Sequence, residues 1–123
     1  MERPILDRAQ RTPTLIKTFF LNGKHHEVTD FLKGPDQYPE NEFNLYTWPD
    51  STLQEIALSF LKITKISNAN ILHFQFIKPH PDSGWQIQDL GEINLKSEVH
   101  DIQTIDYFGF KPGYMLDIAY RSD

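Results

Sequence analysis

The stretch from Leu45 to Ile56 changes its side-chain period in the middle, and this change constrains the fold more than any other feature of the chain. Up to Trp48 the residues are aliphatic, aromatic or β-branched, which is typical of a half-buried strand. Pro49 cannot donate a hydrogen bond to a neighbouring strand, so we expect the strand to end there.

A helix is expected directly afterwards, over about residues 52–64. Thr52 and Glu55 have the spacing of a capping box, in which each side chain satisfies a backbone N–H of the first helical turn. The apolar residues that follow have the spacing of one helix face: Leu53, Ile56, Ala57, Phe60 and Leu61. The apolar face of such a helix must pack against a second layer of structure, and a sheet would provide that layer.

Strands are predicted on both sides of this helix. The first should cover about 15–21, and Asn22-Gly23 favours a tight turn into a second strand over about 25–31. Lys33 to Asn41 contains a glycine and two prolines and should be a loop. After the helix, further strands are expected at 71–77, 85–90 and 114–120, the last of them after the turn signal Pro112-Gly113.

The predicted order of elements indicates an α+β fold, in which a mixed sheet packs on one main helix. A β-grasp fold has this order. At 123 residues the chain is long enough for one domain, which we place at 14–121, after an N-terminal arm at 1–13 that has no apolar period. The segment from Gly91 to Phe110 has scattered apolar residues, and its structure is not predicted.

Composition excludes several classes of function. A net charge of −5 argues against nucleic acid as the main ligand, because phosphate contacts need a basic surface. The chain has no cysteine, so disulfides, thiol catalysis and cysteine-bound zinc are absent. No apolar run approaches the roughly 20 residues of a membrane span, and the N-terminus lacks the apolar core of a secretory signal. We therefore expect an intracellular protein without membrane contact.

No motif for catalysis or for a cofactor is found. The chain has no G-x-S-x-G, no G-x-x-x-x-G-K-[ST] and no H-E-x-x-H, and nothing pairs its carboxylates. His25 and His26 suggest a metal site, but neighbouring side chains on a strand point to opposite faces. We therefore predict no enzyme, no cofactor and no metal site.

Aromatic and apolar side chains are the candidates for a contact surface. Phe43, Tyr46 and Trp48 lie at the joint between strand and helix, where a core position is as reasonable as a contact position. The first strand has two possible registers. If Ile16, Thr18 and Phe20 face the helix, the side chains of Leu15, Phe19 and Leu21 lie on the opposite face. In the other register Ile16 and Phe20 lie there, so either way a partner or the arm should cover apolar groups.

Several segments together resemble a known family. They are Pro4-Ile5 with Arg8 and Pro13, Asn22-Gly23-Lys24-His25-His26 with Asp30-Phe31, Leu45-Tyr46-Thr47-Trp48 with Asp50, Thr52-Leu53 and Glu55, then His73-Phe74-x-Phe76, and Phe110-x-x-Gly113-Tyr114-x-Leu116-Asp117-Ile118-Ala119. In this order they are similar to the eighteen-kilodalton Sin-three-associated polypeptide family, which has a ubiquitin-like β-grasp fold. The resemblance covers most of the chain except the segment between Gly91 and Phe110.

The resemblance implies a protein-interaction adaptor of the nucleus, with the cytoplasm as a second compartment. Members of the family join the apoptosis- and splicing-associated complex, with an Acinus-like or Pinin-like scaffold peptide and an RNA-binding protein of the RRM type. That assembly is linked to the exon-junction complex and mRNA splicing. They also join the histone-deacetylase co-repressor, which acts in transcriptional repression. Nucleic acid would then be contacted only indirectly.

The residues expected to bind the partner are His25, His26, Phe43, Tyr46, Trp48, Phe19 and Leu21. Backbone pairing along a free sheet edge would provide affinity for an extended peptide, and pockets between aromatic side chains would provide selectivity. An alternative hypothesis is that the ubiquitin-like domain binds single-stranded RNA directly through aromatic-rich strands with some Lys and Arg. An enzyme with an unrecognised site is a third hypothesis, and it would require a deep polar pocket.

Overall fold

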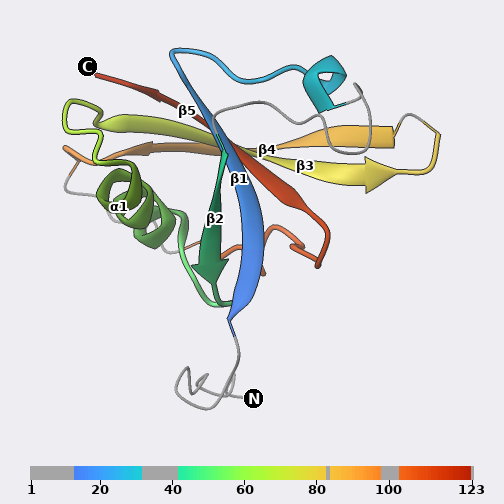
Figure 1. The fold of residues 1–123 in the computed structure, drawn as a ribbon. Helices are drawn as coiled ribbons and strands as arrows, with labels where there is room; N and C mark the ends of the chain where they lie inside the picture. Colours follow the sequence, from blue (N-terminus) through green and yellow to red (C-terminus); the bar gives the residue numbers. More distant parts are fainter. Residues whose placement is uncertain (1–12, 32–41, 83, 98–102, 123) are drawn as a thin grey trace, which may run out of the picture.

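The computed structural model describes residues 13–31, 42–82, 84–97 and 103–122. Within these ranges it contains one mixed sheet and one α-helix, which packs against one face of the sheet (Figure 1). In chain order the elements are β1 (Thr14–Asn22), the short 3-10 helix η1 (Val28–Phe31), β2 (Glu42–Thr47), α1 (Leu53–Thr64), β3 (Ile71–His80), β4 (Gly84–Asn94) and β5 (Met115–Arg121).

The sheet has five strands in the order β2-β1-β5-β3-β4. β1 and β5 run parallel, whereas the β1–β2, β3–β5 and β3–β4 pairs are antiparallel. The last strand of the sequence thus lies in the middle of the sheet. This arrangement confirms the predicted α+β, ubiquitin-like β-grasp architecture.

The predicted helix is confirmed almost to the residue. The Thr52 side chain accepts a hydrogen bond of 3.1 Å from the Glu55 backbone N–H, and α1 follows from Leu53 to Thr64. Phe60 is completely buried, and its ring centroid lies 5.4 Å from that of Phe20 and 5.8 Å from that of Tyr120. The apolar face of α1 therefore packs on the central strands, as its spacing indicated.

The register of the first strand is now decided. Ile16 is completely buried in the core beneath α1, and Phe20 packs on the same core. The side chains of Leu15, Phe19 and Leu21 consequently lie on the face of the sheet away from the helix, because successive residues of a strand alternate between faces. We call this the open face.

The predicted strand over 25–31 is wrong. After β1, the Gly23 N–H donates a hydrogen bond of 2.8 Å to the Tyr120 carbonyl of β5, and the chain continues irregularly into η1. η1 lies against the open face, where Phe31 is buried together with Phe19. Contacts with β5 thus replace the expected hairpin, and the antiparallel neighbour of β1 is β2 instead.

β3 and β4 are longer than predicted, whereas β5 has the predicted length and is shifted by one residue. β3 continues to His80, and β4 continues to Asn94. The pairing of these two strands shifts its register between Phe74 and Gln75 of β3, where Phe74 lies opposite Gly91 of β4, which has φ +100°. Ile105 from the unassigned segment is buried in the core. Residues 1–12 of the expected arm and the expected loop at 33–41 lie outside the described residues.

Candidate partner-binding site

The sheet order places β2 and β4 at the two edges of the sheet. An edge strand exposes backbone N–H and C=O groups that can pair with another chain. In the part of the chain that the structure describes, β2 pairs only with β1. The free edge of β2, opposite β1, lies on the side of α1 (Figure 1).

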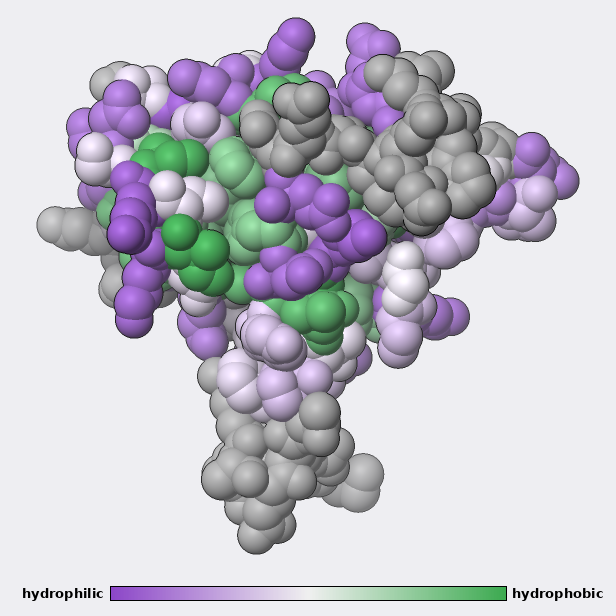
Figure 2. Space-filling model, viewed as in Figure 1, coloured by the Kyte–Doolittle hydropathy of each residue, from purple (hydrophilic) through white to green (hydrophobic). Residues whose placement is uncertain are grey.

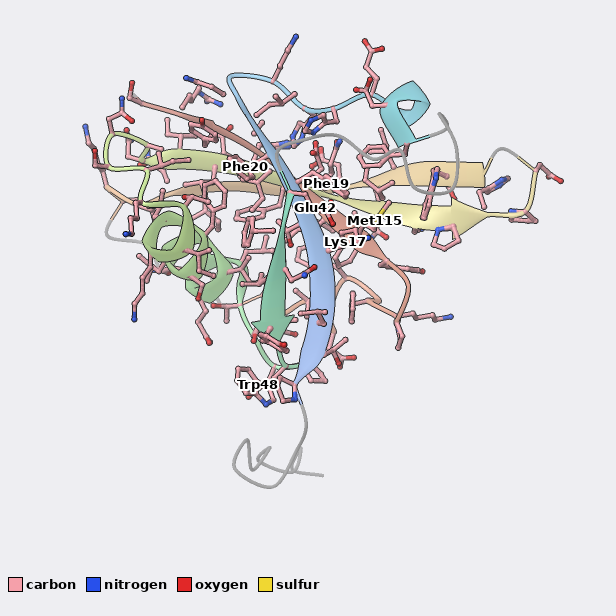
Figure 3. All side chains as sticks on the ribbon, viewed as in Figure 1. Lys17, Phe19, Phe20, Glu42, Trp48 and Met115 are labelled. Atoms are coloured by element: carbon pink, nitrogen blue, oxygen red, sulfur yellow. The ribbon has the colours of Figure 1, made fainter. Side chains whose placement is uncertain are left out.

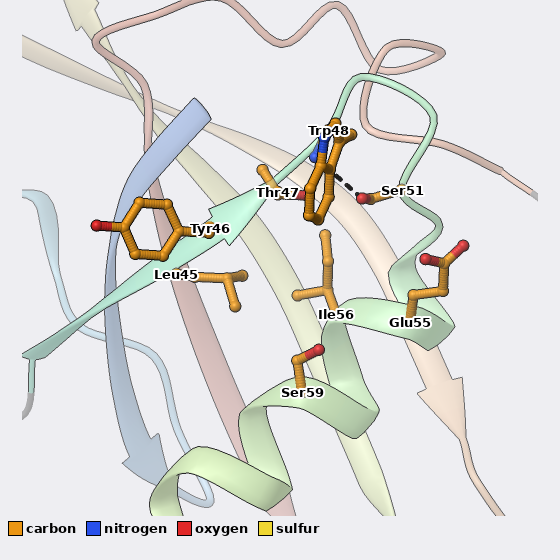
Figure 4. Close-up of a pocket in the computed structure, with 8 residues that line it drawn as sticks. All are labelled: Leu45, Tyr46, Thr47, Trp48, Ser51, Glu55, Ile56 and Ser59. Atoms are coloured by element: carbon orange, nitrogen blue, oxygen red, sulfur yellow. Dashed lines mark hydrogen bonds between the residues drawn. The ribbon is translucent and has the colours of Figure 1, made fainter. Parts of the chain in front are cut away.

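A groove of about 160 Å³ lies between β2 and the first half of α1 (Figure 4). Leu45 and Ile56 are buried at its base, while Glu55 is exposed at its rim. We call this the β2–α1 groove. Its lining residues are Leu45, Tyr46, Thr47, Trp48, Ser51, Glu55, Ile56 and Ser59.

Trp48 is held at the end of this groove by a tight turn. Its backbone N–H donates to the Ser51 hydroxyl at 3.1 Å, and the Ser51 N–H donates to the Trp48 carbonyl at 2.9 Å. Ser51 is itself buried, and its carbonyl accepts a hydrogen bond of 3.0 Å from Ile105. Figure 3 shows the half-buried Trp48 at the far end of β2 from Glu42. These hydrogen bonds fix the backbone of Trp48 at one end of the groove.

The other side of β2 carries an exposed apolar pair. Tyr46 is 64% exposed and Leu15, its cross-strand neighbour on β1, is 48% exposed. The surface in Figure 2 likewise shows hydrophobic patches interrupted by hydrophilic residues over the region of α1 and β2. β2 therefore has apolar surface on both of its faces, the groove on one and the Tyr46–Leu15 pair on the other.

The remaining predicted contact residues lie elsewhere. Phe43 is half-buried on the helix side, with its ring centroid 5.7 Å from that of Phe60, and Leu21 is half-buried on the open face. Phe19 is completely buried, and its ring lies 5.0 Å from that of Phe31 in η1. His26 is 8% exposed. Of the predicted set, Trp48 lies at the end of the β2–α1 groove, and Tyr46 borders the groove with its ring on the opposite face of β2.

The rings of His25 and His26 are in hydrogen-bond contact with a buried carboxylate. Asp117 of β5 is completely buried, and its two oxygens lie 2.7 Å from Nδ1 of His25 and 2.7 Å from Nδ1 of His26. The backbone N–H of His26 and the side-chain amide of Gln75 donate to Oδ2 at 3.0 and 3.3 Å. These donors compensate a carboxylate that burial would otherwise destabilise strongly.

The argument that His25 and His26 must point apart is therefore wrong, because the segment is not a strand. The contacts continue outward: Nε2 of His25 lies 2.5 Å from Nδ1 of His73, and Nε2 of His73 lies 2.9 Å from the exposed Asp89. Among the described residues, no three or more His, Asp or Glu side chains are placed to hold a metal ion. The contacts thus attach the segment before η1 to the sheet.

Sequence reasoning missed this cluster, although one signal was available. Asp117 stands in a strand whose neighbours are apolar, and a carboxylate at such a position requires donors from other segments. The histidine pair could have been considered as that source.

Comparison with known proteins identifies the family. The sequence model of the Sin3 associated polypeptide p18 (SAP18) family matches residues 5–120. The chain belongs to the Sin3 associated polypeptide p18 family. The human histone deacetylase complex subunit SAP18 is 30% identical over 123 residues, which are 96% of this chain and 78% of that protein. The Drosophila melanogaster and Arabidopsis thaliana proteins of the same name are 27% and 28% identical, each over 93% of this chain and 77% and 78% of their own lengths.

The p18 family is a family of complex subunits, not of enzymes, as the sequence predicted. The match includes β2, α1 and the histidine segment, so both the β2–α1 groove and the Asp117 cluster lie within the family region. No helix in the described ranges combines the length and the apolar character that a membrane crossing requires.

Proposed function

We propose that this protein is a non-enzymatic adaptor subunit of a histone-deacetylase co-repressor complex in the nucleus. The observation that carries this proposal is the p18 family match over residues 5–120, together with relatives in human, fly and plant that are named histone deacetylase complex subunits. A role in transcriptional repression follows from membership of such a complex. We propose the cytoplasm as a second compartment.

The adaptor would bind its scaffold through the region of β2. A free strand edge beside a groove suits an extended peptide, because the peptide backbone pairs with the edge and its side chains enter the groove. Tyr46 and Trp48 are the contact residues that we propose at this site. His25 would act indirectly, by holding the segment before η1.

We also propose a second assembly for the same adaptor, the apoptosis- and splicing-associated complex linked to the exon-junction complex. The resemblance noted in the sequence supports this, and it implies an Acinus-like or Pinin-like scaffold peptide with an RRM-type protein as partners. One contact surface could serve both assemblies in turn, because both would offer an extended segment of a larger scaffold.

The co-repressor role is tested by purifying the tagged chain from nuclei of cells that express it. We expect lysine-deacetylase activity and co-repressor subunits, identified by mass spectrometry, to copurify with it. An unrelated ubiquitin-like domain carrying the same tag is the control. Recovery of the chain without deacetylase activity or co-repressor subunits would contradict this role.

The second assembly is tested by calorimetry of the purified chain with Acinus-type and Pinin-type peptides. We expect measurable heat at micromolar concentration, and no heat with a scrambled peptide. The absence of heat up to high micromolar concentration would remove this part of the proposal. A salt-dependent mobility shift of single-stranded RNA by the chain alone would instead favour the RNA-binding alternative.

A further inference from the structure

A row of apolar residues crosses the open face at the end of the sheet where β1 begins. The strand registers place Leu15 of β1 beside Tyr46 of β2. They also place Pro79 of β3 beside Trp85 of β4. Gly113, two residues before β5, lies between the two pairs. The row thus spans the width of the sheet on the face that α1 does not cover.

η1 covers only part of this face. Phe31 of η1 packs on the open face, and the indole N–H of Trp85 donates to the Phe31 carbonyl at 3.2 Å. Beside Trp85 a hollow of about 240 Å³ remains, which we call the Trp85 hollow. A Cβ atom at Gly113 would meet no described atom within 4 Å beyond its chain neighbours, so there is open space above this residue. The lining residues of the hollow are Leu15, Lys17, Trp85, Gly113, Tyr114 and Met115.

The chemistry of the Trp85 hollow favours an aliphatic occupant. Leu15 and Met115 contribute aliphatic side chains from adjacent strands, and Leu15 is 48% exposed. Lys17, the cation in the lining, is already paired with Glu42 at 3.4 Å (both labelled in Figure 3). The hollow has room for one or two aliphatic side chains, since a cavity of about 150 Å³ elsewhere holds benzene. Exposed apolar surface of this kind marks a contact site.

The chain before β1 is long enough to fill the hollow. The described chain begins at Pro13, two residues before Leu15 in the wall of the hollow. From β1 to β4 there are three strand spacings, which amount to about 14 Å. Leu6 precedes Thr14 by eight residues, and an extended chain of that length spans at most about 26–29 Å. Every part of the hollow is therefore within reach of Leu6.

The arm also contains a suitable apolar pair. Ile5 and Leu6 are adjacent aliphatic residues in a segment that otherwise carries mostly charged and polar side chains. The match to the p18 family begins at residue 5, so it includes this pair although β1 starts only at Thr14. A tethered segment meets a nearby surface at an effective concentration in the millimolar range and needs no second molecule. The arm is therefore the best-matched occupant.

We infer that the N-terminal arm docks on the open face of its own sheet, with Ile5 and Leu6 in the Trp85 hollow. This inference goes beyond the proposed adaptor function and does not depend on it. Tyr46, at the other end of the apolar row, remains available to the scaffold. On this inference the folded unit begins near residue 5 and not at residue 14.

The position of the arm is tested by NMR with a spin label, which the absence of cysteine makes site-specific. A label attached to Arg3→Cys should broaden the amide signals of Trp85 and Ile87 on β4. The signals of Leu58 and Lys62, exposed on α1, should stay sharp. Ile5→Asp/Leu6→Asp in the same labelled chain should remove the broadening, because burying these carboxylates in the hollow is unfavourable.

The contact itself is tested by a double-mutant cycle. Ile5→Ala/Leu6→Ala and Leu15→Ala should each lower the Tm by about 3–6 °C. Combined, they should lower it by clearly less than the sum, because both remove the same contact. Leu58→Ala is the matched control, since Leu58 is 54% exposed on α1, and its effect should add to that of the arm variant. Circular dichroism verifies that each variant is folded.

Three results would overturn the inference: equal broadening on β4 and α1, broadening that survives Ile5→Asp/Leu6→Asp, or additive effects of the arm variant and Leu15→Ala. A labelled chain mixed with an unlabelled, isotope-enriched chain tests for a second copy. Broadening of β4 signals in the enriched chain would assign the hollow to that copy and contradict docking within one chain. Sharp β4 signals in every sample would leave the hollow to a partner protein and would equally contradict it.

Discussion

At the scale of single residues, Asp117 explains why two histidines follow β1. Its carboxylate is completely buried in the central strand β5, and His25, His26 and Gln75 supply its hydrogen bonds. Their spacing in the sequence, 91 and 92 residues from Asp117 for the histidines, hides the relation. The sequence alone had no means to find donors so far away along the chain.

Replacing Asp117 by Asn should destabilise the protein by about 2–3 kcal/mol, because the hydrogen bonds to a charged acceptor are lost or weakened. Urea unfolding followed by circular dichroism measures this change. Asp82→Asn is the control, since Asp82 is exposed in the turn between β3 and β4 and its replacement should change stability by less than about 0.5 kcal/mol. Equal effects of the two substitutions would mean that the buried carboxylate contributes little.

Phe19 provides a second prediction at this scale. It was a candidate contact residue, and the structure buries it completely under Phe31. Phe19→Ala should therefore lower the free energy of unfolding by about 3–5 kcal/mol through the cavity that it leaves. Tyr46→Ala, at an exposed position, should lower it by less than about 1 kcal/mol. If Phe19→Ala retained full stability and lost only peptide binding, Phe19 would be a contact residue after all.

At the scale of elements, structure set by neighbouring residues was predicted accurately, and structure set by contacts between distant segments was not. α1 was predicted within one residue, because the Thr52 cap and the apolar spacing are local. The strand over 25–31 was not, because Asn22-Gly23 indicates a turn but not the partner that the next segment finds. The same holds at the proposed binding site. The sequence indicated Tyr46 and Trp48 as candidate contact residues, whereas the groove beside them depends on α1 packing beside β2.

The C-terminus of α1 offers a prediction with a definite sign. Lys65 caps the helix in the left-handed region, with φ +59° and its N–H bonded to the Leu61 carbonyl at 2.9 Å. Lys65→Gly should stabilise the protein by about 0.5–1 kcal/mol, because glycine adopts this conformation without strain. Lys62→Gly, inside the helix, should destabilise it by about 1 kcal/mol. Thermal unfolding of both variants provides the comparison, and destabilisation by Lys65→Gly would contradict the assigned cap.

At the scale of the whole molecule, the fold class could be predicted but the strand order could not. The alternation of residues determines which face of a strand is buried, and it carries no information about which strand lies beside it. β5 lies between β1 and β3, and its Leu116 and Ile118 are completely buried. The sheet edges, and with them the proposed binding site, follow from that order.

This order predicts a gradient of stability across the sheet. Amide hydrogens of β5 from Leu116 to Ala119 should exchange most slowly, at rates set by global unfolding, because both neighbouring strands must separate first. Amides of β2 and β4 should exchange faster. Native-state hydrogen exchange followed by NMR measures each rate. Faster exchange in β5 than in β2 would contradict the central position of β5.

The central position of β5 also affects synthesis on the ribosome. β1 is made early, yet its parallel neighbour emerges only when residues 115–121 have left the exit tunnel. Until then the chain cannot close its sheet, and a nascent chain would expose the apolar side chains of β1 and β3. The proposed docking edge belongs to a complete sheet only after residues 115–121 have been made, so we expect a scaffold to bind there only after this point in synthesis.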